Sequence, residues 1–211
     1  MKPIYTTLSE FNWAKKKQWL IFLEKFDSTW WKKIILAVGD LNRYHHKGFD
    51  NLVPLIAPVL KKNPEWKLKF VGGGEDGTQL LKNLAIEHKV ENQIIFEGYS
   101  TEVARLMSDS EIYVMSSRTE GLPMVLLEAF ARRTACISFN CITGPSDIIN
   151  HNKNGLLIED QNFDEMAKQL DILMNDSELR LKLTNEGANS LDRYKIETIY
   201  NNYLNIFEAI K

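Results

Sequence analysis

Two acidic residues on either side of a proline turn form the stretch of this chain best suited to chemistry. Glu120 and Glu128 are eight positions apart, and Pro123 lies between them. Proline is typical of the first residue of a helix, because its fixed φ suits the turn and its missing N–H is not needed there. A helix that begins at Pro123 leaves backbone amides free at its N-terminus, where unpaired donors and the helix dipole attract anions. The residues that carry these amides are Gly121, Leu122 and Met124.

The spacing of the two acids suits a ligand that contains a phosphate and two sugars. From Pro123 to Glu128 a helix rises about 7–8 Å, at about 1.5 Å per residue. A comparable distance separates the phosphate-linked sugar of a nucleotide sugar from its ribose. The stretch follows an apolar run, Ile112–Met115, and so lies at the carboxyl end of a predicted strand, where open α/β sheets bind ligands. The pattern therefore predicts a nucleotide-sugar site.

Each acid also has a plainer interpretation. Taken alone, Glu120 is a solvated loop acid and Glu128 an ordinary exposed helix residue, as most glutamates are. The run around Glu128, from Val125 to Phe130, is so apolar that we expect a largely buried helix. Because a buried carboxylate needs polar partners, we predict that Glu128 faces a ligand or another polar group.

The Glu-x7-Glu spacing and the approach to it, Ser117–Pro123, resemble the donor site of the family 4 retaining glycosyltransferases of GT-B fold. Each further match is weak alone, but together they follow the family's order and spacing from about Ile34 to Phe207. These matches are Ala37–Gly39, Lys47–Phe49, Phe70–Glu75, Ile95–Gly98, Gly144–Pro145 and Asn154–Leu157. The resemblance implies a hexosyltransferase that transfers a sugar from a nucleotide sugar to a glycan or lipid-linked acceptor, with retention.

The resemblance also implies roles for individual residues. Glu120 and Lys47 are the expected catalytic residues: Glu120 holds sugar hydroxyls, and Lys47 neutralises charge on the departing diphosphate. The amides from Gly121 to Met124 assist at the phosphate, and Glu128 accepts hydrogen bonds from the ribose hydroxyls. Main-chain groups at Gly98 and Tyr99 are expected to meet the base.

The cations of the site depart from the family's pattern at one position. The family usually has an arginine where this chain has Asp40, so Arg43 is the candidate to supply the second positive charge, with Arg118 as a further helper. Protein cations and a helix end would replace a metal, and the resemblance implies no cofactor. His45 and His46 have no third ligand at metal-like spacing, so we expect no metal site.

A glycine-rich turn leaves a second function open. The run Gly72–Gly77 lies between a predicted strand and a predicted helix and fits the dinucleotide-binding pattern, with Glu97 about twenty residues later. This NAD-type alternative ranks second, because the strand is not the first of the domain and no dehydrogenase-like catalytic set follows. The resemblance instead places Gly72 and Gly74 in a flexible loop beside the nucleotide. A non-catalytic fragment is the third class.

Apolar runs alternate with helical patterns, which predicts a parallel sheet. We expect an α/β fold over residues 34–211: a Rossmann-like parallel sheet flanked by helices, the C-terminal half of a GT-B fold, with helical N- and C-terminal extensions. Asp50 is the expected N-cap of a helix that Pro58 should kink. The expected strands are Lys33–Val38, Leu68–Val71, Gln93–Phe96, Ile112–Met115, Ala135–Phe139 and Gly155–Ile158. The expected helices are Asp50–Lys62, Gly77–His88, Thr101–Ser108, Pro123–Arg132, Gly144–Asn150, Phe163–Asn175, Ser177–Ser190 and Ile196–Ile210.

The composition of the chain indicates which classes of partner and which compartment to expect. The 211 residues carry a net charge of −2, which gives no pull toward nucleic acid. Cys136 and Cys141 suit reduced thiols in a cytoplasmic protein, and no signal peptide is seen. The acceptor half of a GT-B enzyme finds no match, so we expect a separate acceptor-binding domain or partner chain. Without it, apolar residues of the last helix should be exposed: Tyr200, Tyr203, Leu204 and Phe207.

Residues 1–33 are expected to form a helical extension with an aromatic stripe and surrounding lysines. The stripe comprises Trp13, Trp19, Leu20, Leu23, Phe26, Trp30 and Trp31. The favoured interpretation is a helix that packs on the domain. The alternative is a basic helix at the inner face of a membrane, or against a partner domain.

Overall fold

The computed structural model describes residues 33–209, in which a single parallel sheet forms the centre of the fold. The expected helix and aromatic stripe before Lys33 lie outside the described residues. The strand order is β3-β2-β1-β4-β5-β6, and every neighbouring pair is parallel. The strands are β1 (Lys33–Val38), β2 (Trp66–Val71), β3 (Ile94–Gly98), β4 (Ile112–Met115), β5 (Ala135–Asn140) and β6 (Leu156–Glu159). This order confirms the predicted Rossmann-like sheet.

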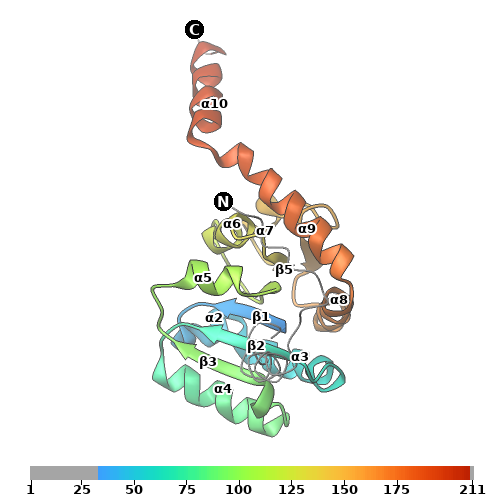
Figure 1. Cartoon of the computed structure of the whole chain (residues 1–211). Helices are drawn as coiled ribbons and strands as arrows, with labels where there is room; N and C mark the ends of the chain where they lie inside the picture. The colour runs from blue at the N-terminus through green and yellow to red at the C-terminus, as the bar shows by residue number, and fades with distance from the viewer. Residues whose placement is uncertain (1–32, 210–211) are drawn as a thin grey trace, which may run out of the picture. The chain divides into compact units, whose positions relative to one another are not determined.

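Helices cover both faces of the sheet, and Figure 1 shows α4 and α5 on opposite sides of β1–β3. The helices with their bounds are α2 (Tyr44–Lys47), α3 (Phe49–Lys62), α4 (Glu75–Glu87), α5 (Val103–Ser108), α6 (Met124–Ala131), α7 (Pro145–Ile148), α8 (Phe163–Asn175), α9 (Ser177–Asn189) and α10 (Ile196–Ala209). Short 3-10 turns are η2 (Leu41–Arg43), η3 (Glu91–Gln93) and η4 (Ser190–Tyr194).

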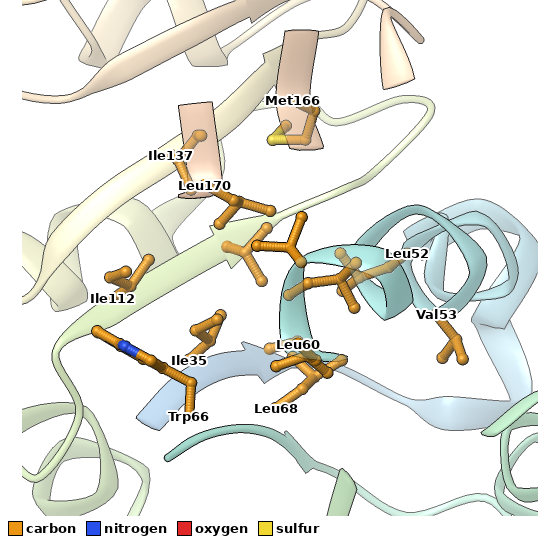
Figure 2. Packing of buried hydrophobic residues seen from close by; sticks show 14 of the residues in the cluster. Ile35, Leu52, Val53, Leu60, Trp66, Leu68, Ile112, Ile137, Met166 and Leu170 are labelled. Atoms are coloured by element: carbon orange, nitrogen blue, oxygen red, sulfur yellow. The ribbon is translucent and has the colours of Figure 1, made fainter. Parts of the chain in front are cut away.

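Alternate residues of each central strand enter two separate cores. In β1, Ile35 packs with residues of α3, α4 and α8, whereas Leu36 packs with residues of α5, α6 and α7. Figure 2 shows part of the first core, where Ile35 of β1, Leu60 of α3 and Leu170 of α8 converge. Because both faces are covered, the central strands β1, β4 and β5 are almost wholly apolar, and this pattern made them predictable from the sequence.

The strand order reverses at β1 and β4. In open α/β sheets this point is a crevice outside the carboxyl ends of the strands, where ligands bind. The segment between β1 and α3 contains Asp40 and Lys47, and the loop after β4 contains Glu120. The topology therefore brings the predicted catalytic residues to the same edge of the sheet.

Among the helix starts that differ from the prediction, two lie next to the predicted site residues. Asp50 is not an N-cap: α3 begins at Phe49, and Gly48 caps it in the left-handed conformation with φ of 66°. The same helix is assigned continuously to Lys62, although it contains both Pro54 and Pro58. Pro123 is the N-cap of α6 rather than its first helical residue, since its ψ of 83° is not helical.

The last helix, α10, exposes the apolar side chains that the sequence predicted would lack a cover. Its exposed apolar residues include Tyr200, Tyr203, Leu204 and Phe207, and the rings of Tyr203 and Phe207 stack with centroids 6.5 Å apart. Among residues 33–209, no helix has the length and apolar character needed to cross a membrane.

Candidate functional site

An ion pair joins the two loops at the strand-order reversal. Lys47, the last residue of α2, places its Nζ 2.8 Å from Oε1 of Glu120, which lies 73 positions later, between β4 and α6. The buried hydroxyl of Ser117 donates to the same Oε1 at 2.7 Å. Both charged side chains are mostly enclosed, with 20% of Lys47 and 13% of Glu120 exposed. The structure thus brings the two predicted catalytic residues together.

The environment of Glu120 favours its ionised form. Burial by itself raises the pKa of this carboxyl, but hydrogen bonds from Lys47 and Ser117, and the charges of Lys47 and His46, outweigh burial and lower the pKa below its ordinary value. Glu120 is therefore a carboxylate at neutral pH. Ser117 is a site residue that the sequence prediction missed, because a serine three residues before a glutamate carries no distinctive signal.

Main-chain contacts fix the Lys47 loop against the loop after β4. The Ser116 hydroxyl donates to the carbonyl of Lys47 at 2.9 Å, and the amide of Arg118 donates to the carbonyl of His46 at 3.0 Å. A Cβ on Gly48 would lie 1.9 Å from the carbonyl oxygen of Ser116. Only glycine permits this approach, so the position of Lys47 depends on its neighbour.

Arg118 is committed to the protein rather than to the pocket. Its guanidinium binds both carboxylate oxygens of Asp50, at 2.7 and 3.1 Å, and also donates to the carbonyl of His45. The helper role of Arg118 at a phosphate stays a prediction, and it would require the guanidinium to share or exchange these protein contacts. The side chain of Arg43 is exposed and makes no hydrogen bond or ion pair with any described residue, whereas its amide donates to the carbonyl of Asp40 at 3.1 Å. Its guanidinium is therefore available to a ligand on the same segment that carries Lys47.

A hydrogen bond from the main chain partly compensates the negative charge of Asp40. Its side chain caps η2 by accepting a hydrogen bond from the amide of Asn42 at 2.9 Å. This cap explains how an acid occupies the position where the resemblance leads one to expect arginine.

The start of α6 offers fewer free amides than predicted. The amide of Met124 donates to the carbonyl of Leu122 at 2.8 Å and is not available to a ligand. The amides of Gly121 and Leu122 donate to no acceptor within residues 33–209, and both residues are exposed. Two donors therefore point out of the turn before α6, next to Glu120.

Glu128 is exposed, which contradicts the predicted burial. The apolar run of α6 buries one face, through Leu126, Ala129 and Phe130, and leaves Met124 and Glu128 one turn apart on the opposite face. The pKa of the buried Tyr113 of β4 is raised, mainly by burial, and the charges of Glu120 and Glu128 also contribute to the rise.

A cavity of about 380 Å³ opens beside the ion pair, at the carboxyl ends of β1 and β2. Its lining residues are Val38, Gly39, Asp40, Val71, Gly72, Gly73, Tyr99, Ser100 and Val103. Tyr99 is 82% exposed, and Gly98 before it has a left-handed φ of 78°. Gly39 connects the cavity to the pair, because a Cβ there would be 3.3 Å from Cγ and Cε of Lys47.

In the glycine-rich turn after β2, backbone atoms of the protein occupy the space that side chains would need. A Cβ on Gly72 would lie 1.8 Å from the carbonyl oxygen of Gly39, and one on Gly74 would lie 2.5 Å from the amide nitrogen of Asn42. A Cβ on Gly77 would lie 1.8 Å from the carbonyl oxygen of Leu41. These glycines allow the turn to pack on η2, which accounts for the dinucleotide-like spacing without a bound pyrophosphate.

Known proteins with similar sequences share this domain but extend beyond it. Residues 23–190 match the family described as glycosyl transferases group 1. An uncharacterized glycosyltransferase of Haemophilus influenzae is 40% identical over 167 residues, which are 79% of this chain and 46% of that protein. A poly(ribitol-phosphate) alpha-N-acetylglucosaminyltransferase of Staphylococcus aureus is 29% identical, and the chain covers 35% of it. The chain thus spans less than half of these curated relatives.

Solved structures have the same architecture. A mutant of S. aureus TarM, in complex with Fondaparinux, alpha-GlcNAc-glycerol and UDP, matches with a TM-score of 0.76 and 25% identity over 91% of this chain and 42% of TarM. The C-terminal domain of LpcC, a glycosyl transferase group 1 family protein of Francisella tularensis, matches with a TM-score of 0.68 and 28% identity over 78% of this chain and 86% of that domain. This chain therefore belongs to the group 1 glycosyl transferases and contains the C-terminal domain of their GT-B fold.

Proposed function

We propose that this chain is the donor-binding domain of a retaining hexosyltransferase and binds a nucleotide sugar at the Lys47–Glu120 pair. The observation that carries the proposal is the pair itself: a cation and a carboxylate meet at 2.8 Å at the strand-order reversal, beside two amides that donate to no acceptor within residues 33–209. Isolated buried charges are costly, so opposite charges held together at a ligand-binding edge indicate a site rather than a core contact.

The donor would extend from the ion pair into the cavity. Lys47, Arg43 and the amides of Gly121 and Leu122 would bind the diphosphate, since charged donors and a helix start suit phosphate oxygens. The base would occupy the cavity beside Tyr99, whose exposed ring is free to stack on it. The exposed carboxylate of Glu128 would then receive the ribose hydroxyls.

Binding would exchange the partners of the ion pair. As the diphosphate arrives, Lys47 would turn from Glu120 to the phosphate oxygens, and Glu120, still held by Ser117, would accept hydrogen bonds from sugar hydroxyls. Lys47 would also stabilise the charge that develops on the leaving diphosphate. In a retaining transfer, the acceptor attacks the face from which the diphosphate departs. Protein cations would perform the role of a metal.

The relatives indicate the kind of acceptor. They include a poly(ribitol-phosphate) alpha-N-acetylglucosaminyltransferase, an amylovoran biosynthesis glycosyltransferase and an alpha-1,4-N-acetyl-D-galactosaminyltransferase whose name contains an undecaprenol-linked glycan. We infer a glycan or lipid-linked acceptor for this chain, in bacterial polysaccharide assembly at the cytoplasmic side of a membrane. Because the chain covers between 35% and 51% of these relatives, transfer would require an acceptor-binding domain supplied by a separate segment or partner.

The NAD-type alternative receives no support from the glycines that suggested it. Gly72, Gly74 and Gly77 contact η2 and the end of β1, so their missing side chains make room for protein rather than for a pyrophosphate.

A thermal-shift panel tests the proposal. UDP-, GDP- and ADP-sugars at millimolar concentration should raise the Tm of the chain, because ligand at about 100 times its Kd stabilises by about 2.7 kcal/mol. NAD should have no effect, and EDTA should leave the nucleotide-sugar shift unchanged. Lys47→Gln should abolish the shift, whereas Lys33→Gln, at the opposite end of β1 in an exposed pair with Glu65, should retain it. A shift with NAD alone, or none with any nucleotide sugar, would overturn the proposal.

A further inference from the structure

Thr143 has a backbone conformation that its side chain disfavours. It follows β5 and has φ of 64°, in the left-handed region. The other non-glycine residues of the described chain with positive φ are unbranched at Cβ: Lys89, Arg133, Asn152 and Gln161. A β-branched residue in this region is strained, and such strain persists only where surrounding contacts enforce it.

The contacts that enforce this conformation involve the loop that carries Glu120. The Thr143 hydroxyl donates to the main-chain carbonyl of Glu120 and lies 2.7 Å from the carbonyl oxygen of Ile142. A hydroxyl has one proton, so the two carbonyls share it. Thr119 and Ile142 also pair as an isolated parallel bridge. The loop after β5 thus runs alongside the loop after β4.

The next residue extends the contact to the start of α6. Gly144 has φ of 91°, and a Cβ there would lie 2.1 Å from the carbonyl oxygen of Gly121 and 2.6 Å from Cδ of Pro123. Together, Thr143 and Gly144 contact three of the four residues from Glu120 to Pro123. This is the segment that carries the site's carboxylate and its two unpaired amides.

Cys141, directly after β5, begins the same loop with a buried thiol. Its pKa is raised to about 11, first by burial and then by the charges of Glu120 and Asp160. At neutral pH Cys141 is therefore uncharged.

We propose that Thr143 is a positioning residue whose hydroxyl fixes Glu120 for its contacts with Lys47, Ser117 and the sugar of the donor. The strained backbone aims the hydroxyl at the Glu120 carbonyl, and Gly144 lets the turn come close enough to do so. This inference rests on the proposed function in one respect, the contact between Glu120 and the sugar. The effect on the Lys47–Glu120 pair does not depend on a ligand.

The matched variants are Thr143→Val, which keeps the branched Cβ and removes the hydroxyl, and Thr143→Ser, which keeps the hydroxyl. The first measurement is the titration of the Glu120 carboxyl by carbon-13 NMR in the full chain. Thr143→Val should raise the pKa of Glu120 toward its ordinary value, because the hydrogen bonds that lower it are loosened. Thr143→Ser should titrate as wild type. If Thr143→Val does not fold, Thr143→Ala removes the hydroxyl with less crowding and should give the same result.

The second measurement compares UDP-glucose with UDP by calorimetry. Thr143→Val should weaken the binding of UDP-glucose by about fivefold and the binding of UDP by much less, because one neutral hydrogen bond is lost at the sugar side of the site. A general loss of structure would weaken both ligands equally. Unchanged Glu120 titration in the hydroxyl-free variants would overturn the positioning role, whatever the ligands do. If wild type binds neither ligand but the titration shifts as expected, the positioning role stands and UDP-glucose is excluded as the donor.

Discussion

Lys47 and Glu120 are each other's principal charged partner in the unliganded fold. The pair is largely enclosed, with two hydrogen bonds on one carboxylate oxygen, so neither residue is left as an uncompensated charge. An enclosed pair of this kind is stable until a ligand offers both residues better partners. In the function proposed above, a nucleotide sugar would do so, since it would provide phosphate oxygens for Lys47 and hydroxyls for Glu120.

The lowered pKa of Glu120 predicts a defined loss of stability in acid. A carboxyl whose pKa is lower in the folded than in the unfolded state stabilises the fold above its ordinary value of 4.5. That stabilisation is lost as the pH falls from 4.5 through the folded pKa. Urea unfolding at pH values from about 6 down to about 3 should therefore show a steeper decline in the free energy of unfolding for wild type than for Glu120→Gln.

The exposed Glu91→Gln variant is the control for this pH series and should keep the wild-type slope. Equal slopes for wild type and Glu120→Gln would show that Lys47 and Ser117 do not favour the carboxylate.

At the scale of single residues, the sequence indicated members of the candidate site but not the contacts between them. Glu120 and Lys47 were predicted from a motif, yet nothing in the sequence measures a contact across 73 positions. The prediction that Glu128 is buried was wrong, because the apolar run around it is buried on one side of α6 only. With a period of 3.6 residues, Glu128 and Met124, which lies four positions before it, share the exposed side of the helix. Thr143 and Ser117 act through hydrogen bonds that their residue types do not announce.

Among the elements, the strands were more predictable than the loops that carry function. The predicted bounds of β1 and β4 match the structure, because strands covered by helices on both faces are apolar along their whole length. The turns depend on close approaches between backbone segments, as at Gly48. In the sequence, such an approach is visible only as an isolated glycine. The start of α3 at Phe49 instead of Asp50 follows from that left-handed glycine.

The close approach at Gly48 gives a prediction for the junction of α2 and α3. Gly48→Ala should destabilise the fold by about 2–3 kcal/mol, because alanine is strained at φ of 66° and its Cβ would overlap the Ser116 carbonyl. Gly121→Ala is the matched control, since no atom lies within 4 Å of its Cβ position. Urea unfolding of both variants measures the difference. Equal stability would mean that the two loops separate at no cost.

For the molecule as a whole, the last helix bears on the need for a partner. The apolar residues of α10 are exposed along one face, and they line an open hollow of about 530 Å³. Exposed apolar surface of this extent is uncommon on monomeric proteins and marks a contact surface. The chain covers 46% of its Haemophilus influenzae relative, so a cover from outside this sequence fits the comparison.

We therefore expect the isolated chain to associate with itself through α10 as its concentration rises. Replacing Tyr203 and Phe207 together by glutamate should shift the chain toward monomer in sedimentation velocity, because two charges in an apolar contact remain unpaired and poorly hydrated. Leu181→Glu, an exposed apolar residue on α9, is the control and should not alter association. If the wild-type chain stays monomeric over a ~100-fold range of concentration, the exposed apolar face of α10 does not cause self-association. The nucleotide-sugar shift of the double variant should stay at the wild-type value, since α10 contributes no residue to the Lys47–Glu120 site.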